Sequence, residues 1–483
     1  MTNDSNLTLP FELPSYLCGE AVSAGTPIQV TYPWNNSLTG TVSQVTRDQA
    51  DRCVDRVLHR QTSEKPLSRY RRHEILERAR QLLSERAEAF ASLIRLETGL
   101  CVRETRYEVG RAMDVLKSAA MLLMQDDSDT FACDISPSEE SRRIYTFRKP
   151  LPIAFAITPF NHPLNQVAHK VAPAIAAGTP LLLKPSEKTP LTALRFCELL
   201  YEAGLPEWML SVFLAPIDTV VEPLICDERI PLVTFTGGTS VGKHIASIAG
   251  YKKLCLELGG NAPLIILPDA DMDLAVKLAC EGNFRNSGQR CTAVKRTLVH
   301  EAIHDVFVEK FVELAGTYKC GDPADEATRV GTVIDEQAAQ LLEGRIHLAV
   351  QDGAEVLLGG HRQGAQIEPT VLINVPRETE MVVAESFGPL APVICVKDLD
   401  DAIAYANAGS FGLSSAVVTN NLQDAMRCVR EIDSGTTNVN QVPGYRIEYS
   451  PFGGIKDSGL GIKEGVAEAM RFMTSLKSYS LPW

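Results

Sequence analysis

The stretch PIAFAITPFNHPLNQVAHKVAPAIAAGTPLLLKP, residues 152–185, contains two short apolar runs separated by a helical segment. The runs PIAFAITP and TPLLLKP have the length of buried strands, and each is bounded by turn residues. The segment LNQVAHKVAPAIAAG lies between them and is predicted to be a helix. A strand, a helix and a second strand at this spacing indicate a parallel α/β unit.

The same alternation continues along the chain. Further strand candidates are LSVFLAP, PLVTFTG and APLIILP. The second half contains apolar runs of the same kind, namely EVLLGG, TVLINV and APVICVK. Residues 66–118 are predicted to be helical with a stop at Gly99, and residues 126–140 are predicted to be a polar crossing segment before the strand RRIYTFRKP. The sequence therefore predicts an α/β fold built on parallel sheets.

Composition limits the possible classes of protein. A chain of 483 residues is expected to form two or three domains, and a net charge of −13 argues against nucleic acid or an anionic membrane as the main partner. No apolar run approaches the ~20 residues that span a bilayer, and the start MTNDSNLTLPFELPSY lacks the features of a secretory signal. The 12 cysteines form no CxxC pair and the 9 histidines no HExxH motif. We expect a cytoplasmic protein without a metal site or a disulfide framework.

The loop NSGQRCTAVK, residues 286–295, places a cysteine beside a fixed positive charge. Cys291 directly follows Arg290. The thiolate is the nucleophilic form of cysteine, and a neighbouring cation favours it. Alternatively, Arg290 binds a negative group on the molecule that the thiol attacks. The sequence alone leaves both interpretations open.

The segment FTGGTSVGKH, residues 235–244, follows a predicted strand and opens a predicted helix. It nearly matches the phosphate-binding pattern GxxxxGK[ST], but His244 stands where the hydroxyl residue belongs. Glycines and a helix N-terminus still favour a phosphate group. Taken alone, the segment would favour a plain strand-to-helix turn over a phosphate site, and a kinase or ATPase remains a weaker alternative.

Polar residues also follow other strand candidates. Asn161 and His162 come after the first strand, where open α/β sheets bind ligands. Lys184 and Glu187 end the next strand and could reach a ribose or a phosphate, or belong to a solvated loop. Glu257 follows an apolar run, and apolar surroundings could raise its pKa and make it a general base near neutral pH.

Taken in order, TPFNHP, LLLKPSEKTP, FTGGTSVGK, LELGGNAP, NSGQRCTAVK, ESFGP and SPFGGIKDSGLG resemble the aldehyde dehydrogenase superfamily over nearly the whole chain. The resemblance implies a Rossmann-like NAD-binding domain from residues 1–127 and 151–257 and an α/β catalytic domain from residues 258–458. It also implies a small β oligomerisation arm, residues 128–150, which with the C-terminal tail, residues 459–483, would pair with another subunit. A homodimer or homotetramer is expected.

The resemblance assigns catalytic roles to particular residues. Cys291 would attack the aldehyde carbon, forming a thiohemiacetal and, after hydride transfer, a thioester. Asn161 and the backbone N–H of Cys291 would stabilise the developing oxyanion. Glu257 would activate the water that hydrolyses the thioester, and Lys170 would assist proton movement. The presence of Glu257 favours hydrolysis to a free acid over transfer to coenzyme A.

The resemblance also assigns a set of cofactor-binding residues. These are Thr158, Phe160, Lys184, Glu187, Gly237, Gly238, Ser240, Glu385 and Phe387. Glu187 would hydrogen-bond the ribose hydroxyls of the cofactor and repel a 2′-phosphate. We therefore expect NAD rather than NADP.

The positions that line the substrate channel in this family are unusually cationic here. They hold Arg111, His162, Arg290, Thr292 and Arg446. Several cations at one pocket favour an anionic aldehyde, held by charge-assisted hydrogen bonds.

The segments GQRCTAVKR and PFGGIKDSGLGIKEGVAEAMRFMTSLKSYSLPW are most similar to the phosphonoacetaldehyde dehydrogenase branch, which implies oxidation of phosphonoacetaldehyde to phosphonoacetate. The alternatives are a non-phosphorylating glyceraldehyde-3-phosphate, lactaldehyde or succinic semialdehyde dehydrogenase. An alternative of another class is a catalytically inactive structural or binding member of the fold.

Overall fold

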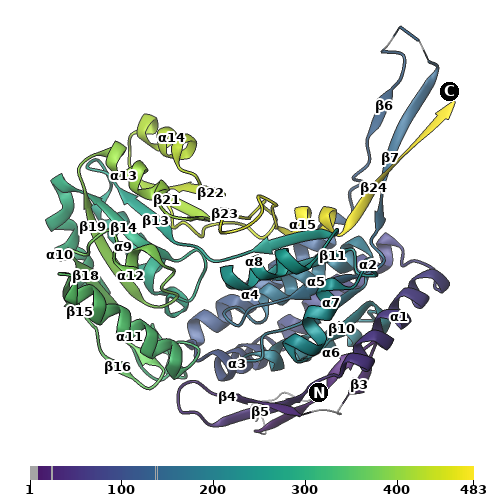
Figure 1. The fold of residues 1–483 in the computed structure, drawn as a ribbon, viewed down its shortest axis with the longest axis horizontal. Helices are drawn as coiled ribbons and strands as arrows, with labels where there is room; N and C mark the ends of the chain where they lie inside the picture. Colours follow the sequence, from purple (N-terminus) through teal and green to yellow (C-terminus); the bar gives the residue numbers. More distant parts are fainter. Residues whose placement is uncertain (1–8, 23–25, 136, 139, 483) are drawn as a thin grey trace.

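Two seven-stranded sheets organise the two halves of the molecule, and a narrow arm extends away from them (Figure 1). The structure is a computed structural model that describes residues 9–22, 26–135, 137–138 and 140–482. Residues 1–8 and Trp483 lie outside the described residues, so the first half of the start MTNDSNLTLPFELPSY, which is predicted to lack the features of a secretory signal, is not described.

The first sheet has the strand order β12-β11-β8-β9-β10-β2-β3. Its strands are β2 (Ser15–Leu17), β3 (Glu20–Val22), β8 (Ala154–Ile157), β9 (Leu181–Lys184), β10 (Leu210–Val212), β11 (Leu232–Thr236) and β12 (Lys253–Glu257). The strands β8 to β12 are parallel to their neighbours in this group, whereas β2 joins β10 antiparallel. All residues of β8 and β9 are buried, which explains their uninterrupted apolar sequences.

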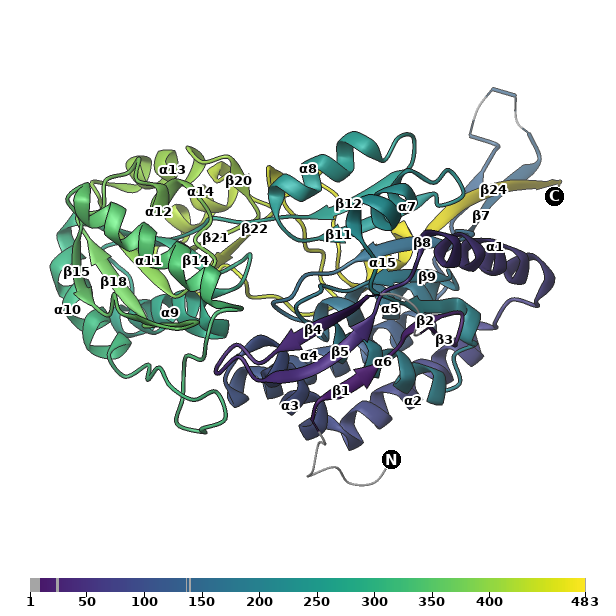
Figure 2. The ribbon, with the colours of Figure 1, turned by 60° about the horizontal axis from the view of Figure 1, so that its bottom comes forward.

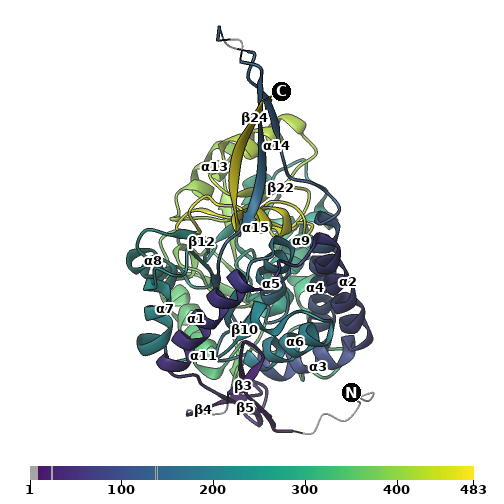
Figure 3. The ribbon, with the colours of Figure 1, turned by 90° about the vertical axis from the view of Figure 1, so that its right-hand side faces the viewer.

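Helices cover both faces of this sheet (Figure 3). They are α1 (Arg47–Ser63), α2 (Arg69–Glu85), α3 (Ala87–Thr98), α4 (Val102–Leu122), α5 (Asn165–Ala177), α6 (Pro190–Glu202), α7 (Glu222–Cys226) and α8 (Thr239–Ile248), with the short turns η1 (Glu207–Met209) and η2 (Ile217–Val221). The helices α2 to α6 pack on one face, and α1, α7 and α8 on the other. A small sheet of β1 (Phe11–Leu13), β5 (Leu38–Ser43) and β4 (Pro27–Thr31) borders this half.

The second sheet has the strand order β15-β18-β19-β14-β13-β21-β22. Its strands are β13 (Ala262–Ile266), β14 (Val294–His300), β15 (Glu355–Leu358), β18 (Thr370–Ile373), β19 (Leu390–Val396), β21 (Ser414–Val418) and β22 (Thr436–Val439). All neighbouring strands in it are parallel except β15 and β18. The parallel α/β organisation predicted from the strand-helix alternation is confirmed in both halves.

Figure 2 shows α9 and α10 on one face of the second sheet and α11, α13 and α14 on the other. The helices of this half are α9 (Met272–Phe284), α10 (His304–Ala315), α11 (Glu336–Gln351), α12 (Glu380–Val383), α13 (Leu399–Asn407) and α14 (Leu422–Glu431), with the turns η3 (Arg285–Gly288) and η4 (Glu301–Ile303). Two small strand pairs complete it, namely β16 (Arg362–Gln363) with β17 (Gln366–Ile367), and β20 (Phe411–Gly412) with β23 (Ile455–Lys456).

The arm is a three-stranded antiparallel sheet of β6 (Thr130–Ala132), β7 (Arg142–Pro150) and β24 (Thr474–Pro482). The C-terminal tail pairs with β7 of its own chain, from Thr474 opposite Pro150 to Pro482 opposite Arg142. The predicted polar crossing segment contributes β6 to this sheet. The helix α15 (Val466–Phe472) leads into β24 and packs on α5. Pairing of the arm with another subunit remains a prediction.

None of the helices in the described ranges combines the length and apolar character needed to cross a membrane. The predicted helical region 66–118 is confirmed as α2, α3 and α4, and Gly99 ends α3 as expected. The domain boundaries that the resemblance implies remain a proposal.

Gly99 lies where the first half of the molecule contacts the second, and its carbonyl accepts a hydrogen bond from the Thr332 N–H at 2.9 Å. It adopts a left-handed φ of 71°, and a Cβ there would lie 1.7 Å from Thr332 Oγ1. We predict that Gly99→Ala lowers the free energy of unfolding by about 1–3 kcal/mol, because it adds backbone strain and a collision. The melting temperature of the purified variant measures this.

The matched control is Gly344→Ala in α11, where a Cβ meets nothing within 4 Å. This change should leave the melting temperature unchanged or raise it, because alanine restricts the unfolded chain. Equal melting temperatures of the Gly99→Ala variant and the unmodified protein would contradict the account of Gly99.

Candidate active site

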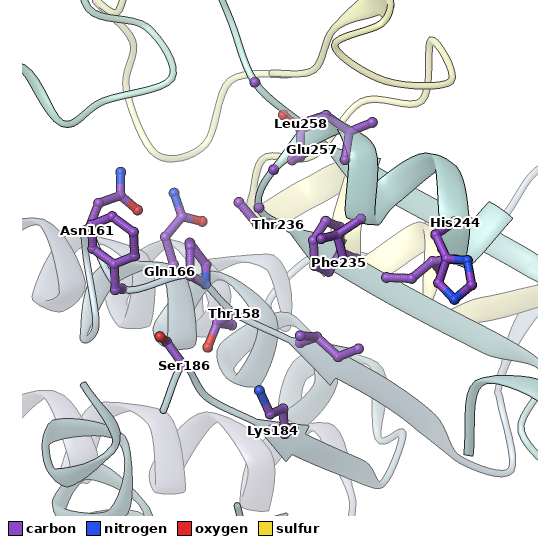
Figure 4. A pocket seen from close by; sticks show the side chains of 18 of the residues that line it. Thr158, Asn161, Gln166, Lys184, Ser186, Phe235, Thr236, His244, Glu257 and Leu258 are labelled. Atoms are coloured by element: carbon purple, nitrogen blue, oxygen red, sulfur yellow. The ribbon is translucent and has the colours of Figure 1, made fainter. Parts of the chain in front are cut away.

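A cavity of about 410 Å³ lies where the carboxyl ends of β8, β9, β11 and β12 meet. It brings together many residues that the sequence analysis selected from distant segments: Thr158, Phe160, Asn161, Lys184, Glu187, Gly237, Gly238, Glu257, Cys291, Glu385 and Phe387. Figure 4 shows Asn161 at one end of the cavity and His244 at the other. Ser240 lies in the first turn of α8 with an exposed side chain and does not line the cavity.

The loop before Cys291 is a tight left-handed turn. Asn286, Ser287 and Gly288 have φ values of 57°, 51° and 69°. The Asn286 Nδ2 group donates hydrogen bonds to the carbonyls of Asn161, at 3.2 Å, and Gln289, at 3.3 Å. The turn is thus tied to the end of β8, and it fixes the backbone that presents the half-buried Cys291.

The environment of Cys291 holds its sulfur in the neutral form. Burial and, to a smaller extent, the carboxyl groups of Glu385 and Glu257 raise the pKa of the Cys291 thiol to about 12, against the opposing effect of Arg446 and Lys295. A thiol with this pKa is mostly protonated near neutral pH, so it needs a proton acceptor when it attacks.

Asn161 lies beside the loop of the nucleophile. Its Nδ2 group donates to the carbonyl of Gln289 at 2.9 Å. The backbone N–H of Cys291 makes no hydrogen bond within the described residues, so it is available as a donor. An amide and a backbone N–H close to a nucleophile can together stabilise an oxyanion.

Glu257 ends β12 in an apolar setting. Both of its carboxyl oxygens are buried and have no hydrogen-bond partner in the described part of the chain. Burial and the neighbouring charge of Glu464 raise the pKa of Glu257 well above its usual range. A carboxyl group with a raised pKa and free oxygens is suited to accept a proton near neutral pH.

Lys170 is fully buried and is paired with a residue that the sequence analysis missed. Its Nζ donates to Thr234 Oγ1 at 2.8 Å and forms an ion pair with Glu464. Burial opposes ionisation of Glu464, but Lys170 holds the pKa of that carboxyl below its usual value. Glu464 comes from the C-terminal segment and belongs to no local motif of chemical meaning, so only the tertiary structure places it here.

The part of the cavity that is lined by Thr158, Thr236 and the N-terminus of α8 suits a dinucleotide. The hydroxyl oxygens of Thr158 and Thr236 are buried there without a partner in the described residues. Gly238, the residue before α8, provides no side-chain cap, so the N–H groups of the first turn of the helix are free to bind a phosphate. At the ribose position, Lys184 forms an ion pair with Glu187. Unpaired hydroxyls and an uncapped helix are what a bound NAD would satisfy.

Glu385 and Phe387 also line the cavity. The Gly260 N–H donates to Glu385 Oε1 at 3.0 Å, and burial raises the pKa of this carboxyl. The ring of Phe387 meets Phe160 edge-on, with centroids 5.7 Å apart. Both residues line the cavity together with Cys291, and the charge of Glu385 acts on the Cys291 thiol, so they could hold the nicotinamide end of the cofactor next to it.

Arg290 is a half-buried cation that forms no ion pair with a carboxylate in the described part of the chain. Its Nη2 donates to the carbonyls of Glu281 and Gly282, both at 2.8 Å, and its Nε has no partner among the described residues. Burial and the neighbouring Arg285 lower the pKa of Arg290 to about 10. An anion placed here would relieve an electrostatic penalty that the protein leaves uncompensated.

Arg446 is the second such cation. Its guanidinium lies 4.0 Å from the centroid of the Phe452 ring and forms no ion pair within the described ranges. Burial and the charge of Arg111 lower its pKa, and Cys291 and Glu257 are close enough to act on it. Arg446 thus lies near the nucleophile, and Arg290 directly precedes it in the chain, and neither forms an ion pair among the described residues.

The other three predicted substrate residues are differently placed. Arg111 is ion-paired with Glu448, at 2.5 Å between Nε and Oε1, so it is not a free cation. His162 Nδ1 lies 3.5 Å from Glu108 Oε2 with little exposure. Thr292 faces Gly444, where a Cβ would approach Thr292 Oγ1 to 2.4 Å.

A family model described as "Aldehyde dehydrogenase family" matches residues 20–479. The chain belongs to the aldehyde dehydrogenase family. It is 36% identical over 470 residues to the 3-sulfolactaldehyde dehydrogenase of Priestia megaterium, covering 97% of this chain and 98% of the relative. The fold and the enzyme class predicted from the sequence, an NAD(P)-dependent aldehyde dehydrogenase, are confirmed.

Solved structures of this family superimpose closely. Aldehyde dehydrogenase 21 from Physcomitrella patens, in complex with its reaction product succinate, has a TM-score of 0.94 at 33% identity, covering 98% of this chain and 99% of that one. An NAD-dependent aldehyde dehydrogenase from Sinorhizobium meliloti has a TM-score of 0.93 at 30% identity, covering 100% and 97%. The roles of individual residues in this chain remain proposals.

The raised pKa of Cys291 makes its reactivity depend on pH. In the protein without cofactor, we predict slow alkylation of Cys291 by iodoacetamide at pH 7 and a rate that still increases above pH 9, because only the thiolate reacts. Peptide mass mapping follows the site, and the exposed Cys226 serves as the internal comparison. A rate at Cys291 that is already constant at pH 7 would contradict the burial argument.

Proposed function

We propose that this enzyme oxidises a small anionic aldehyde to its carboxylic acid with NAD. The observation that supports the substrate class is the presence near Cys291 of two half-buried arginines, Arg290 and Arg446, that form no ion pair among the described residues. Neutral aldehydes would leave both guanidinium groups without an ion-pair partner, whereas an anionic substituent would pair with them.

The described residues suit each step of that reaction. Cys291 loses its thiol proton to solvent water and attacks the carbonyl carbon, and the Asn161 amide with the Cys291 N–H stabilises the oxygen that becomes negative. When bound, NAD accepts the hydride that leaves the thiohemiacetal carbon. Glu257 then takes a proton from water as the water attacks the thioester, and the acid and the Cys291 thiol are released.

Phosphonoacetaldehyde is the substrate that we propose, giving phosphonoacetate. A phosphonate group carries up to two negative charges and three acceptor oxygens, so it matches two guanidinium groups in charge and in hydrogen bonding. A sulfonated aldehyde is the second candidate, because the Priestia megaterium relative is named for one. A sulfonate has the same three oxygens but a single negative charge.

NAD is the proposed cofactor, and the position of Glu187 supports the preference over NADP. Its carboxylate lines the cavity beside Lys184 and would repel a 2′-phosphate there. The NAD-dependent Sinorhizobium meliloti relative is consistent with this choice.

Arg446→Met tests the proposed substrate class. We predict that kcat/KM for phosphonoacetaldehyde falls roughly 10–100-fold, the equivalent of a lost charge-assisted hydrogen bond. Propanal should be affected much less. The measurement is NADH formation at 340 nm with phosphonoacetaldehyde, sulfoacetaldehyde, glyceraldehyde-3-phosphate, succinic semialdehyde, lactaldehyde and propanal.

The matched control is Arg430→Met, which removes an exposed arginine at the end of α14. It should leave the whole substrate profile unchanged. A wild-type preference for sulfoacetaldehyde over phosphonoacetaldehyde would favour the second candidate. A preference for lactaldehyde or propanal that Arg446→Met does not alter would refute the anionic-aldehyde assignment.

Glu187→Gln tests the cofactor assignment. Loss of the negative charge should raise kcat/KM with NADP, because the repulsion of the 2′-phosphate disappears and Lys184 is released as a cation. The ratio of kcat/KM for NADP to that for NAD should increase at least tenfold, measured with a single aldehyde. An unchanged ratio would show that Glu187 does not set the preference.

A further inference from the structure

Glu448 is the centre of a buried charge cluster that the sequence analysis did not detect. Its carboxylate accepts from Arg111 Nε at 2.5 Å and Nη2 at 3.2 Å, and it lies 2.5 Å from His169 Nε2. Only 8% of Glu448 is exposed. One carboxylate thus joins α4, which carries Arg111, to α5, which carries His169.

Glu448 stands two residues after Arg446 in a segment that is held mainly by backbone hydrogen bonds and by the contact of Arg446 with the Phe452 ring. Tyr445 and Ile447, which flank Arg446, are 55% and 62% exposed, so the segment gains little from apolar burial. Its backbone is held by Asn438 Nδ2, which donates to the carbonyl of Tyr445 at 3.2 Å, and by the Val466 N–H, which donates to the carbonyl of Glu448 at 3.1 Å. The buried ionic contact of this segment is the pairing of the Glu448 carboxylate with Arg111 and His169.

The charges around Arg446 give this contact its importance. Arg111 and Arg446 are both cations and repel each other, as the influence of Arg111 on Arg446 shows. Glu448 binds Arg111 and attracts Arg446 as well. Without the carboxylate, the repulsion between Arg446 and Arg111 would be opposed only by the contact of Arg446 with the Phe452 ring and by a few backbone hydrogen bonds.

We propose that Glu448 is a positioning residue that holds Arg446 at the anion-binding end of the site, with Arg111 and His169 as its anchors on α4 and α5. Arg111 then acts through Glu448 and not by touching the substrate. This inference rests on the proposed function for the role of Arg446, but the anchoring itself can be tested without any substrate.

The first test is the substrate dependence of Glu448→Gln. The variant keeps the size of the side chain and removes its charge. KM for phosphonoacetaldehyde should rise at least tenfold while kcat changes less, and KM for propanal should stay within twofold. Glu448→Asp, which restores the charge on a shorter side chain, should recover part of the loss.

The control for this test is Glu326→Gln, which breaks an exposed ion pair between Glu326 and Arg106, a residue of the same helix α4 that carries Arg111. It should leave both KM values unchanged. An equal rise of KM for phosphonoacetaldehyde and propanal in Glu448→Gln would overturn the proposal, because a merely structural role affects both substrates alike.

The second test separates anchoring from direct binding by Arg111. If Arg111 acts only through Glu448, then Arg111→Met and Glu448→Gln should raise KM by similar factors, and the double variant should be no worse than either. If Arg111 binds the substrate itself, the factors should multiply in the double variant. Multiplying factors would overturn the proposal.

The third test uses the peptide bond after Arg446 as a probe, since trypsin cleaves after arginine. Cleavage between Arg446 and Ile447, followed by mass spectrometry, should be several-fold faster in Glu448→Gln and in Arg111→Met than in the unmodified enzyme or in Glu326→Gln. Unchanged cleavage in both variants would overturn the anchoring.

This third readout distinguishes the two hypotheses. If the unmodified enzyme does not prefer anionic aldehydes, the proposed function fails, yet faster cleavage in Glu448→Gln would still support the anchor. If the enzyme prefers anionic aldehydes and cleavage is unchanged, the inference about Glu448 fails and the proposed function stands.

Discussion

The parallel pairing of β8 with both β9 and β11 is the constraint on which the site depends. Parallel strands end at the same edge of a sheet, so the segments that follow them must meet there. The end of β8 supplies Asn161, the end of β9 supplies Lys184, and the turn after β11 leads into the N-terminus of α8. The buried, uninterrupted apolar sequences of β8 and β9 make this pairing stable and leave the polar residues only at the ends.

The balance of buried charge indicates which groups the protein satisfies internally and which it leaves for a ligand. Lys170 is neutralised by Glu464, and Arg111 by Glu448. Other groups have no such partner among the described residues, namely Glu257, Arg290 and Arg446. Because an unpaired buried charge is costly, groups left in this state are expected to find partners during function. Water and the substrate anion are the partners that the aldehyde dehydrogenase reaction offers.

Burial also sets the chemistry of the reacting groups in a coordinated way. The thiol of Cys291 and the carboxyl of Glu257 both have raised pKa values, because burial disfavours the charged form of the nucleophile and of the base alike. Each carboxyl group near the sulfur disfavours the thiolate, and the nearby cations Arg446 and Lys295 oppose this effect. An anionic substrate that neutralises Arg446 would therefore also alter the balance around the sulfur.

The sequence by itself determined the α/β class, the helices on either side of Gly99, and the family, because apolar periodicity and motifs around Cys291 and Asn161 are local properties of the chain. It could not determine which of the predicted substrate-binding cations lack an ion-pair partner in the fold. Arg111 and Glu448 are 337 positions apart, and only folding brings them to 2.5 Å, which turns a predicted substrate ligand into an ion-paired side chain. The tail likewise reads as an edge strand, but the tertiary structure decided that it pairs with β7 of its own chain. The residues that form a strand pattern are neighbours in the sequence. Ion pairs and strand partners, in contrast, depend on which distant segments the fold places side by side.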